Sequence, residues 1–163
     1  MSNFDLNQIN PKSHIHFIGI GGISMSGLAQ IMLQKGYTVT GSDRSKSHIT
    51  DKLEKLGAVI FEGHADTNIK DSDIVVYTAA VHDDNPEIQA AKKSGIPLVS
   101  RAEFLGAIMK LYSNAAGIAG THGKTTTTSM LAHALISAEV DPTVSVGGEL
   151  DIIGGNIKTG KSE

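Results

Sequence analysis

A glycine-rich segment that ends in lysine and threonine has the composition of a phosphate-binding loop. Residues Gly120–Thr128 read GTHGKTTTT, after the apolar run Ala115–Ala119 and before the helix-patterned run Ser129–Ile136. Glycines let a backbone approach phosphate groups without a Cβ clash, and a helix directs its positive dipole end at the bound anion. The order of strand, glycine-rich turn and helix therefore predicts a seat for ATP or a close relative.

The side chains of this loop have distinct predicted roles. We expect Lys124 to reach the β- and γ-phosphates as the catalytic cation, because a lysine at a helix start is unfavourable unless an anion is bound. The Thr125 hydroxyl is in the register of a ligand to phosphate-bound Mg²⁺, although Thr125 and Thr126 could instead be plain N-terminal helix residues. The predicted ATP contacts are Gly120, Thr121, His122, Gly123, Lys124, Thr125 and Thr126.

A second glycine-rich turn lies near the amino terminus. The apolar run His14–Ile18 leads into Gly19-Ile20-Gly21-Gly22, then a segment with helical spacing, and then the strand-like run Tyr37–Thr40. Asp43 follows at about the distance where a dinucleotide-binding fold places its ribose-binding acid, roughly twenty residues on. Ser24 replaces the third glycine of GxGxxG, so NAD and another phosphate ligand both remain open, and Asp43 could instead cap a helix.

The rest of the chain alternates between helix and strand patterns, which predicts a parallel sheet covered on both faces. The further expected helices are His48–Leu56, Pro86–Lys93 and Glu103–Leu111, and the further expected strands are Ala58–Phe61, Ile74–Tyr77, Ile96–Val99 and Thr143–Val146. Ligands collect at the carboxyl ends of parallel strands. Both glycine-rich loops follow such ends.

Composition excludes several classes of protein. The chain has 163 residues, of which 40% are hydrophobic, and a net charge of −3 argues against a protein that wraps nucleic acid. It has no cysteine, and its histidines lack metal-ligand spacing. Residues 1–13 are polar and contain no apolar run of signal-peptide or membrane-span length. We expect a cytoplasmic protein that binds neither nucleic acid nor membrane. The sequence does not indicate its oligomeric state.

Both loops resemble those of the Mur ligase family, which assembles the peptide stem of bacterial cell-wall precursors. The shortened GT-x-GKT form, with Ile118 at the glycine of the strict P-loop spacing, is typical of that family. Within that family, a histidine between GT and GK, as His122 is here, resembles the loop of the ligases that act on muramate with L-alanine or with a tripeptide. The stretch His16–Ala29 (HFIGIGGISMSGLA) favours the alanine-adding branch, and Gly41–Asp43, Asp84–Glu87 and Arg101–Glu103 fit the same pattern.

The resemblance implies an α/β fold with two domains. A Rossmann-like parallel-sheet domain would span residues 1–111, and the start of a P-loop-type α/β ATPase domain would span residues 112–163. The first loop would then bind a UDP-sugar in place of NAD. The implied UDP-sugar contacts are Gly19, Gly21, Gly22, Ile23, Ser24, Asp43 and His64. His64 would reach the uridine under this interpretation and is otherwise an exposed loop histidine.

The resemblance also implies a reaction, the ATP- and Mg²⁺-dependent joining of L-alanine to UDP-N-acetylmuramate through an acyl phosphate in peptidoglycan precursor synthesis. Two alternatives stay open, namely a muramyl-tripeptide recycling ligase and a non-catalytic module that binds NAD or another nucleotide. The roughly fifty residues after the first domain are too few to bury a parallel-sheet core. We therefore expect the front part of a longer protein, catalytically incomplete by itself.

Overall fold

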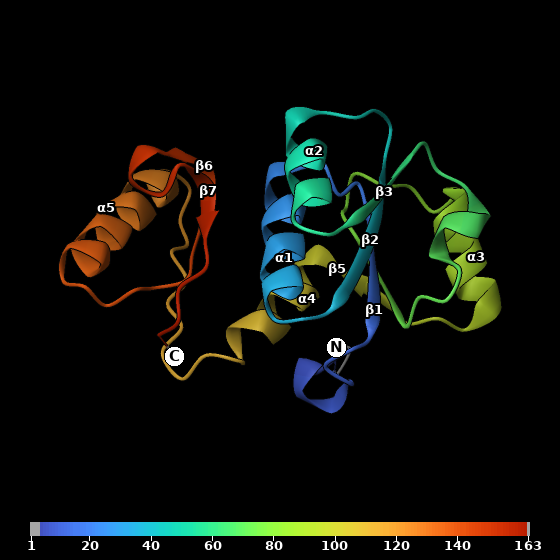
Figure 1. Cartoon of the computed structure of the whole chain (residues 1–163), viewed down its shortest axis with the longest axis horizontal. Helices are drawn as coiled ribbons and strands as arrows, with labels where there is room; N and C mark the ends of the chain where they lie inside the picture. The colour runs from blue at the N-terminus through green and yellow to red at the C-terminus, as the bar shows by residue number, and fades with distance from the viewer. Residues whose placement is uncertain (1–3, 163) are drawn as a thin grey trace. The chain divides into compact units, whose positions relative to one another are not determined.

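The computed structural model describes residues 4–162, which divide into two compact units between Leu111 and Tyr112. The first unit holds a five-stranded parallel sheet in the order β3-β2-β1-β4-β5 (Figure 1). The strands are β1 (His14–Ile18), β2 (Thr38–Asp43), β3 (Val59–Glu62), β4 (Ile74–Tyr77) and β5 (Leu98–Ser100). This order is that of half a doubly wound α/β fold, and it confirms the predicted Rossmann-like class.

Helices cover both faces of this sheet. They are α1 (Ile23–Gln34), α2 (His48–Lys55), α3 (Pro86–Ser94) and α4 (Arg101–Met109), with the short 3-10 helices η1 (Leu6–Gln8) and η2 (Asp66–Ile69). Figure 1 shows α1 and α2 on one face and α3 on the other. Among residues 4–162, no helix combines the length and the apolar character that a membrane crossing requires.

Local sequence signals explain where these helices begin and end. Pro86 occupies the first turn of α3, and Gly95 ends the helix in the left-handed conformation at φ 70°. A capping box between Ser100 and Glu103 starts α4 at Arg101, earlier than the predicted Glu103. The strand expected at Ile96–Val99 begins only at Leu98, because Pro97 has no N–H to give to the ladder.

The two faces of the sheet differ in polarity near β1. Phe17 points to one face, where its ring meets Phe104 of α4 edge-on with ring centroids 5.5 Å apart. Ile18 points to the other face and joins a buried cluster with Ile88 and Ala91 of α3. Because strand side chains alternate, His16 shares the face of Ile18. The face under α3 thus carries a polar group beside an apolar core.

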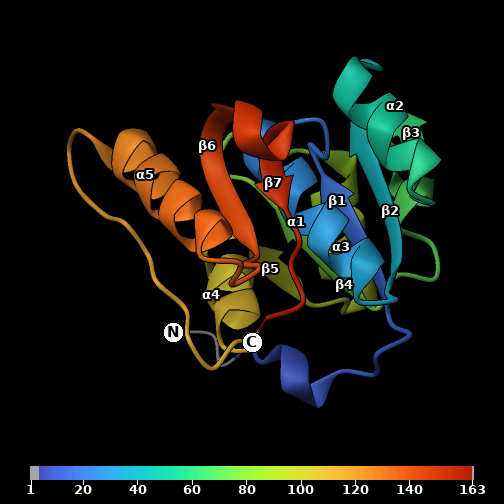
Figure 2. The same ribbon diagram turned by 60° about the vertical axis from the view of Figure 1, so that its left-hand side comes forward.

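The second unit contains one helix and one hairpin. Its elements are α5 (Lys124–Ser137), β6 (Val144–Leu150), the 3-10 helix η3 (Asp151–Ile153) and β7 (Gly155–Lys158). The strands β6 and β7 pair antiparallel, and Figure 2 shows α5 running alongside β6. The strand β6 is longer than the predicted Thr143–Val146, and the glycine-rich tail contributes β7.

One prediction for this unit is wrong. The run Ala115–Ala119 forms no strand and is largely exposed. A strand needs a neighbour for its N–H and C=O groups, and in the described part of this unit β6 and β7 pair only with each other. The helix begins at Lys124, as expected for a lysine at a helix start, and includes the threonine run before the patterned segment Ser129–Ile136; Gly123 is its N-cap at φ 77°.

Candidate nucleotide-binding sites

The first glycine-rich loop joins β1 to α1 at the carboxyl edge of the sheet, and β2 holds it in place. The N–H groups of Gly19 and Ile20 donate to the carbonyl oxygen of Ser42 at 2.8 and 3.0 Å. The N–H of Gly21 donates to Asp43 Oδ2 at 2.8 Å. The loop therefore keeps its shape through contacts with the neighbouring strand. The first turn of α1 follows it with N–H groups that no intrahelical carbonyl can accept.

Gly21 and Gly22 differ in what a side chain would meet. A Cβ on Gly21 would lie 2.8 Å from Asp43 Oδ2, so a side chain there would displace the carboxylate that binds the Gly21 N–H. A Cβ on Gly22 would lie 3.4 Å from the Gly19 carbonyl oxygen, an ordinary contact. Gly22 is the N-cap of α1 at φ −66°, which suits any residue. Packing does not demand a glycine at this position, whereas the close approach of a ligand would.

Asp43 braces the loop. Besides receiving the N–H of Gly21, its carboxylate accepts a hydrogen bond from the N–H of Arg44 at 2.8 Å. The alternative role as a helix cap is wrong, because Ser47 is the N-cap of α2 in a capping box with Thr50. Contact with a ribose remains a prediction for Asp43.

A cation whose contact was not predicted lies at the rim of this loop, although its stretch, Arg101–Glu103, fits the family resemblance. Arg101, the first residue of α4, directs Nη1 to Ser24 Oγ at 3.2 Å. Ser24 and the half-exposed Ile23 form the first turn of α1. Guanidinium groups pair well with phosphate oxygens. The signal that could have found Arg101 is its place directly after β5, at the same edge of the sheet.

His64 follows β3, and its side chain is partly buried, with Nδ1 directed at other protein groups. Its side chain is 21% exposed, and Nδ1 lies 2.8 Å from Glu87 Oε2 and 3.0 Å from Ser42 Oγ. His64 is thus a partly buried residue with fixed partners rather than a freely exposed loop histidine. Its predicted contact with uridine stays a prediction.

Glu87 is the fully buried acid at the centre of this group. Its Oε2 accepts from Ser42 Oγ at 2.7 Å, and its Oε1 accepts from Asn68 Nδ2 at 2.8 Å. His16 Nε2 lies 3.4 Å from Oε1 at ion-pair distance, without directed hydrogen-bond geometry. Burial acts to raise the pKa of the Glu87 carboxyl, but the interactions with His16, Ser42 and Asn68 outweigh it and hold the pKa below its usual value.

From its sequence context, Glu87 was expected only as part of the helix that begins at Pro86 and of the family-like stretch Asp84–Glu87. The missed signal was polar residues at alternating positions of buried strands, His16 in β1 and Thr40 and Ser42 in β2. Such side chains are costly to bury unless they find partners. They therefore indicate an internal polar group on one face of the sheet.

The second glycine-rich loop precedes α5, and its lysine turns back onto it. Lys124 Nζ donates to the carbonyl oxygens of Gly120 and Thr121 at 2.5 and 3.1 Å. His122 and Gly123 are exposed, like the rest of the loop. The ammonium group thus lies against its own loop, at the positive end of the α5 dipole, where an anion would be attracted.

Thr125 and Thr126 lie in the first turn of α5. A Cβ on Gly147 of β6 would lie 3.9 Å from Thr125 Oγ1, so the glycine leaves room beside the hydroxyl. A hydroxyl oxygen suits Mg²⁺ as one ligand of six. Among the residues that the structure describes, no group of three acidic or histidine side chains could hold a metal.

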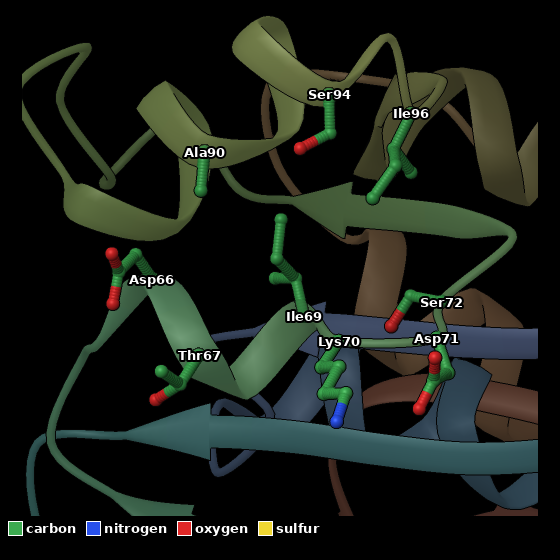
Figure 3. A pocket seen from close by; sticks show the side chains of 9 residues that line it. All are labelled: Asp66, Thr67, Ile69, Lys70, Asp71, Ser72, Ala90, Ser94 and Ile96. Atoms are coloured by element: carbon green, nitrogen blue, oxygen red, sulfur yellow. The ribbon is translucent and has the colours of Figure 1, made fainter.

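A cavity of about 490 Å³ lies between η2 and α3, and its lining includes no residue of the first glycine-rich loop (Figure 3). Its lining includes Lys70, Ser72, Ser94 and Ile96. These residues precede β4 and β5, so the cavity opens at the amino edge of the sheet. Parallel sheets bind their ligands at the carboxyl edge, and the cavity is therefore not the candidate site.

Comparison with known proteins places this geometry in a family. The model of the family described as "Mur ligase family, catalytic domain" matches residues 14–113. UDP-N-acetylmuramate–L-alanine ligase of Acetivibrio thermocellus is 55% identical over the whole chain, which covers 35% of that protein. The ligase of the same name from Clostridium botulinum (strain Kyoto / Type A2) is 60% identical over 96% of the chain and 34% of its own length. The chain spans about a third of the length of these curated relatives.

Solved structures show the same likeness. The UDP-N-acetylmuramate–alanine ligase MurC from Thermotoga maritima superposes with a TM-score of 0.85 at 40% identity, over 91% of this chain and 35% of that one. The UDP-N-acetylmuramate:L-alanyl-γ-D-glutamyl-meso-diaminopimelate ligase from Neisseria meningitides reaches 0.83 at 33% identity, over 91% and 47%. Fold and loop positions are thus similar to those of ligases that act on muramate derivatives.

Proposed function

This chain belongs to the Mur ligase family, and on that premise we propose that it supplies the sugar-nucleotide seat and the phosphate loop of an ATP-dependent ligase that joins L-alanine to UDP-N-acetylmuramate. The observation that carries the proposal is identity of 55% along all 163 residues to a ligase of that name. Because ATP and nucleotide sugars are cytosolic substrates, we infer a cytoplasmic enzyme of peptidoglycan precursor synthesis.

Each unit takes one nucleotide under this proposal. Residues 1–111 bind the UDP-sugar, with the diphosphate at the Gly19–Ser24 loop, and residues 112–163 contribute the ATP loop. The loop that β2 braces, with Arg101 at its rim, supports the first assignment. The Lys124 ammonium beside the exposed loop supports the second.

The chemistry asked of the second loop is charge neutralisation. The muramate carboxylate would attack the γ-phosphorus of ATP to give an acyl phosphate and ADP, and the alanine amine would then displace phosphate from the acyl carbon. Lys124 would bind the transferring phosphoryl oxygens, and the Thr125 hydroxyl would hold the Mg²⁺ that accompanies ATP. We expect these residues to bind nucleotide, and we expect the 163-residue chain to show no alanine-dependent phosphate release.

Calorimetric titration tests the sugar-nucleotide assignment. UDP-N-acetylmuramate should bind the chain at a single site, and NADH should not. Binding of NADH at micromolar concentration without binding of UDP-N-acetylmuramate would instead support the rival function, a nucleotide-binding module with NAD on the first loop. Substitution of Arg101 by Met should lower the affinity for UDP-N-acetylmuramate, because it removes a cation at the rim of the loop while the neighbouring Ser24 keeps its place.

A muramyl-tripeptide ligase remains the second candidate, because that class of structure superposes almost as well as the alanine ligase, 0.83 against 0.85. The sequence comparison favours the alanine ligase, with 40% identity against 33% among the solved structures. Both ligases act on UDP-N-acetylmuramate and differ in the amine that they join to it. A ligation assay of the full-length enzyme with L-alanine and with the tripeptide L-alanyl-γ-D-glutamyl-meso-diaminopimelate would therefore separate the two candidates.

A further inference from the structure

The imidazole of His64 faces two oxygen atoms that can only accept hydrogen bonds. Ser42 Oγ donates its single proton to Glu87 Oε2 at 2.7 Å. The same Oε2 lies 2.8 Å from His64 Nδ1, and Ser42 Oγ lies 3.0 Å from it. Since the hydroxyl proton is already used, both neighbours of Nδ1 present lone pairs. The proton of a neutral His64 must then sit on Nδ1.

This assignment requires that Glu87 is ionised, and its surroundings meet that requirement. Asn68 Nδ2 donates to Oε1 at 2.8 Å and also lies 3.3 Å from the Gly63 carbonyl oxygen, which fixes the orientation of the amide. His16 Nε2 faces Oε1 at 3.4 Å. A carboxyl group enclosed by donors is stabilised as the carboxylate, and the pKa of Glu87 is accordingly lowered.

The group sits directly behind the first glycine-rich loop. The Ser42 carbonyl oxygen receives the N–H groups of Gly19 and Ile20, while the Ser42 hydroxyl serves the buried acid. The next residue, Asp43, holds Gly21. His64 follows β3, at the same carboxyl edge of the sheet as the loop, and its side chain is 21% exposed. Within residues 4–162, Nε2 has no hydrogen-bond partner.

We propose that Glu87 is a positioning residue that, together with Ser42, holds His64 in the Nδ1–H tautomer and so presents Nε2 as a hydrogen-bond acceptor to the sugar nucleotide. This inference rests on the proposed function. An acceptor nitrogen selects ligand groups that carry N–H or O–H, such as the uracil imide or a ribose hydroxyl. It disfavours a phosphate oxygen, which also accepts. His64 thus recognises the nucleoside part, and the glycine-rich loop recognises the diphosphate.

Nitrogen-15 NMR of the imidazole rings tests the tautomer without any ligand. At neutral pH the wild-type His64 should show a protonated Nδ1 and an unprotonated Nε2. In Glu87→Met the Ser42 hydroxyl is released and can donate to Nδ1, so the tautomer should invert to Nε2–H. Glu87→Gln keeps a carbonyl oxygen that can accept from Nδ1 and should retain the wild-type pattern. Glu62→Gln, at an exposed acid two residues before His64, is the matched control and should change nothing.

Titration with two probes then tests the ligand assigned to His64. Glu87→Met should lower the affinity for UDP about tenfold and leave the affinity for inorganic pyrophosphate unchanged, because only UDP carries hydrogen-bond donors for Nε2. Equal weakening of both probes would overturn the specificity claim. A wild-type spectrum with Nε2 protonated would overturn the positioning role, even if Glu87→Met fails to fold. If the wild-type chain binds no UDP, the proposed function fails, while the spectrum still decides whether Glu87 positions the ring.

Discussion

The two glycine-rich loops share a local composition but are held by different means. Three backbone N–H groups of the first loop are fixed by Ser42 and Asp43 of the neighbouring strand β2. In the second loop, Lys124 donates to carbonyl oxygens of the same loop. The described residues directly before this loop form no strand. A seat built by tertiary contacts is ready before the ligand arrives. In the second loop the lysine must exchange its carbonyl partners for phosphate, which offsets part of the binding energy.

The first unit is also more tightly packed than the second. In the first unit, β1 and β4 are almost fully buried, and Phe17, Ile18 and Val75 have no exposed surface. In the described part of the second unit, the helix α5 buries only Ala132, and Met130 is 68% exposed. Motions that open a structure locally are easier where few apolar contacts resist them. The comparison predicts that substitutions at buried positions of the first unit cost more folding stability than substitutions at exposed positions of the second.

The largest effect is expected from Gly41→Ala in β2. A Cβ at Gly41 would lie 2.5 Å from Ile20 Cδ1 and 2.8 Å from the Phe17 carbonyl oxygen, so backbone as well as side chain must move. We expect a loss of about 3 kcal/mol in the free energy of unfolding, measured by urea denaturation. Gly106→Ala in α4 is the control, because its Cβ would meet nothing within 4 Å. It should stabilise by up to about 1 kcal/mol. An unchanged urea midpoint for Gly41→Ala would contradict the tight seat of the first loop.

The second largest effect is expected from Glu87→Gln, and it depends on pH. The pKa of Glu87 is lower in the folded chain than its usual value of 4.5. The carboxylate therefore contributes stability that is fully present above about pH 4.5 and is lost as the pH falls through the folded pKa. At pH 7 the variant should be less stable by about 2 kcal/mol, because the donors around the acid lose their charged acceptor. Below pH 4.5 this difference in stability should shrink. Urea denaturation of both proteins at pH 7 and below pH 4.5 measures it.

The sequence predicted the first unit well because its signals are local. Alternating helix and strand patterns located every strand of the parallel sheet, and the glycine spacing located the loop between β1 and α1. The glycines, Lys124 and Thr125 of the second loop were found for the same reason, since lysine and threonine directly follow a glycine. The strand expected before this loop, Ala115–Ala119, was the wrong prediction.

Non-local features could not be predicted in this way. The polar group around Glu87 draws Ser42 from β2, His64 from the turn after β3 and Asn68 from η2, and no spacing along the chain links them. The run Ala115–Ala119 is apolar enough for a strand, but a strand also needs a partner. Pairing is a property of the folded chain that a single segment does not encode.

A smaller effect, on binding alone, is expected from Gly22→Ala. The new Cβ makes an ordinary contact at 3.4 Å, and the backbone at φ −66° accepts alanine without strain. The urea midpoint should therefore stay within experimental error. A methyl group at the helix N-cap would stand in the path of the diphosphate, and UDP-N-acetylmuramate should bind about tenfold more weakly, equivalent to about 1.4 kcal/mol. Unchanged affinity by calorimetry would place the diphosphate elsewhere.

The smallest effect is expected from Asp141→Asn in the second unit, where an exposed acid is bound by Lys158 and Lys161. The hydrogen bond from Lys158 lowers the pKa of Asp141 below 3.8, and the N–H of Lys161 adds to this. Asparagine tolerates the left-handed backbone at φ 52° and can still accept from the N–H of Lys161 through its one carbonyl oxygen. The substitution thus removes the charge and the second acceptor, which receives the Lys158 ammonium group. Water and salt screen an exposed pair. The small loss of stability should therefore disappear in 1 M NaCl, whereas the loss in Glu87→Gln should persist, because burial excludes the screening ions from that carboxylate.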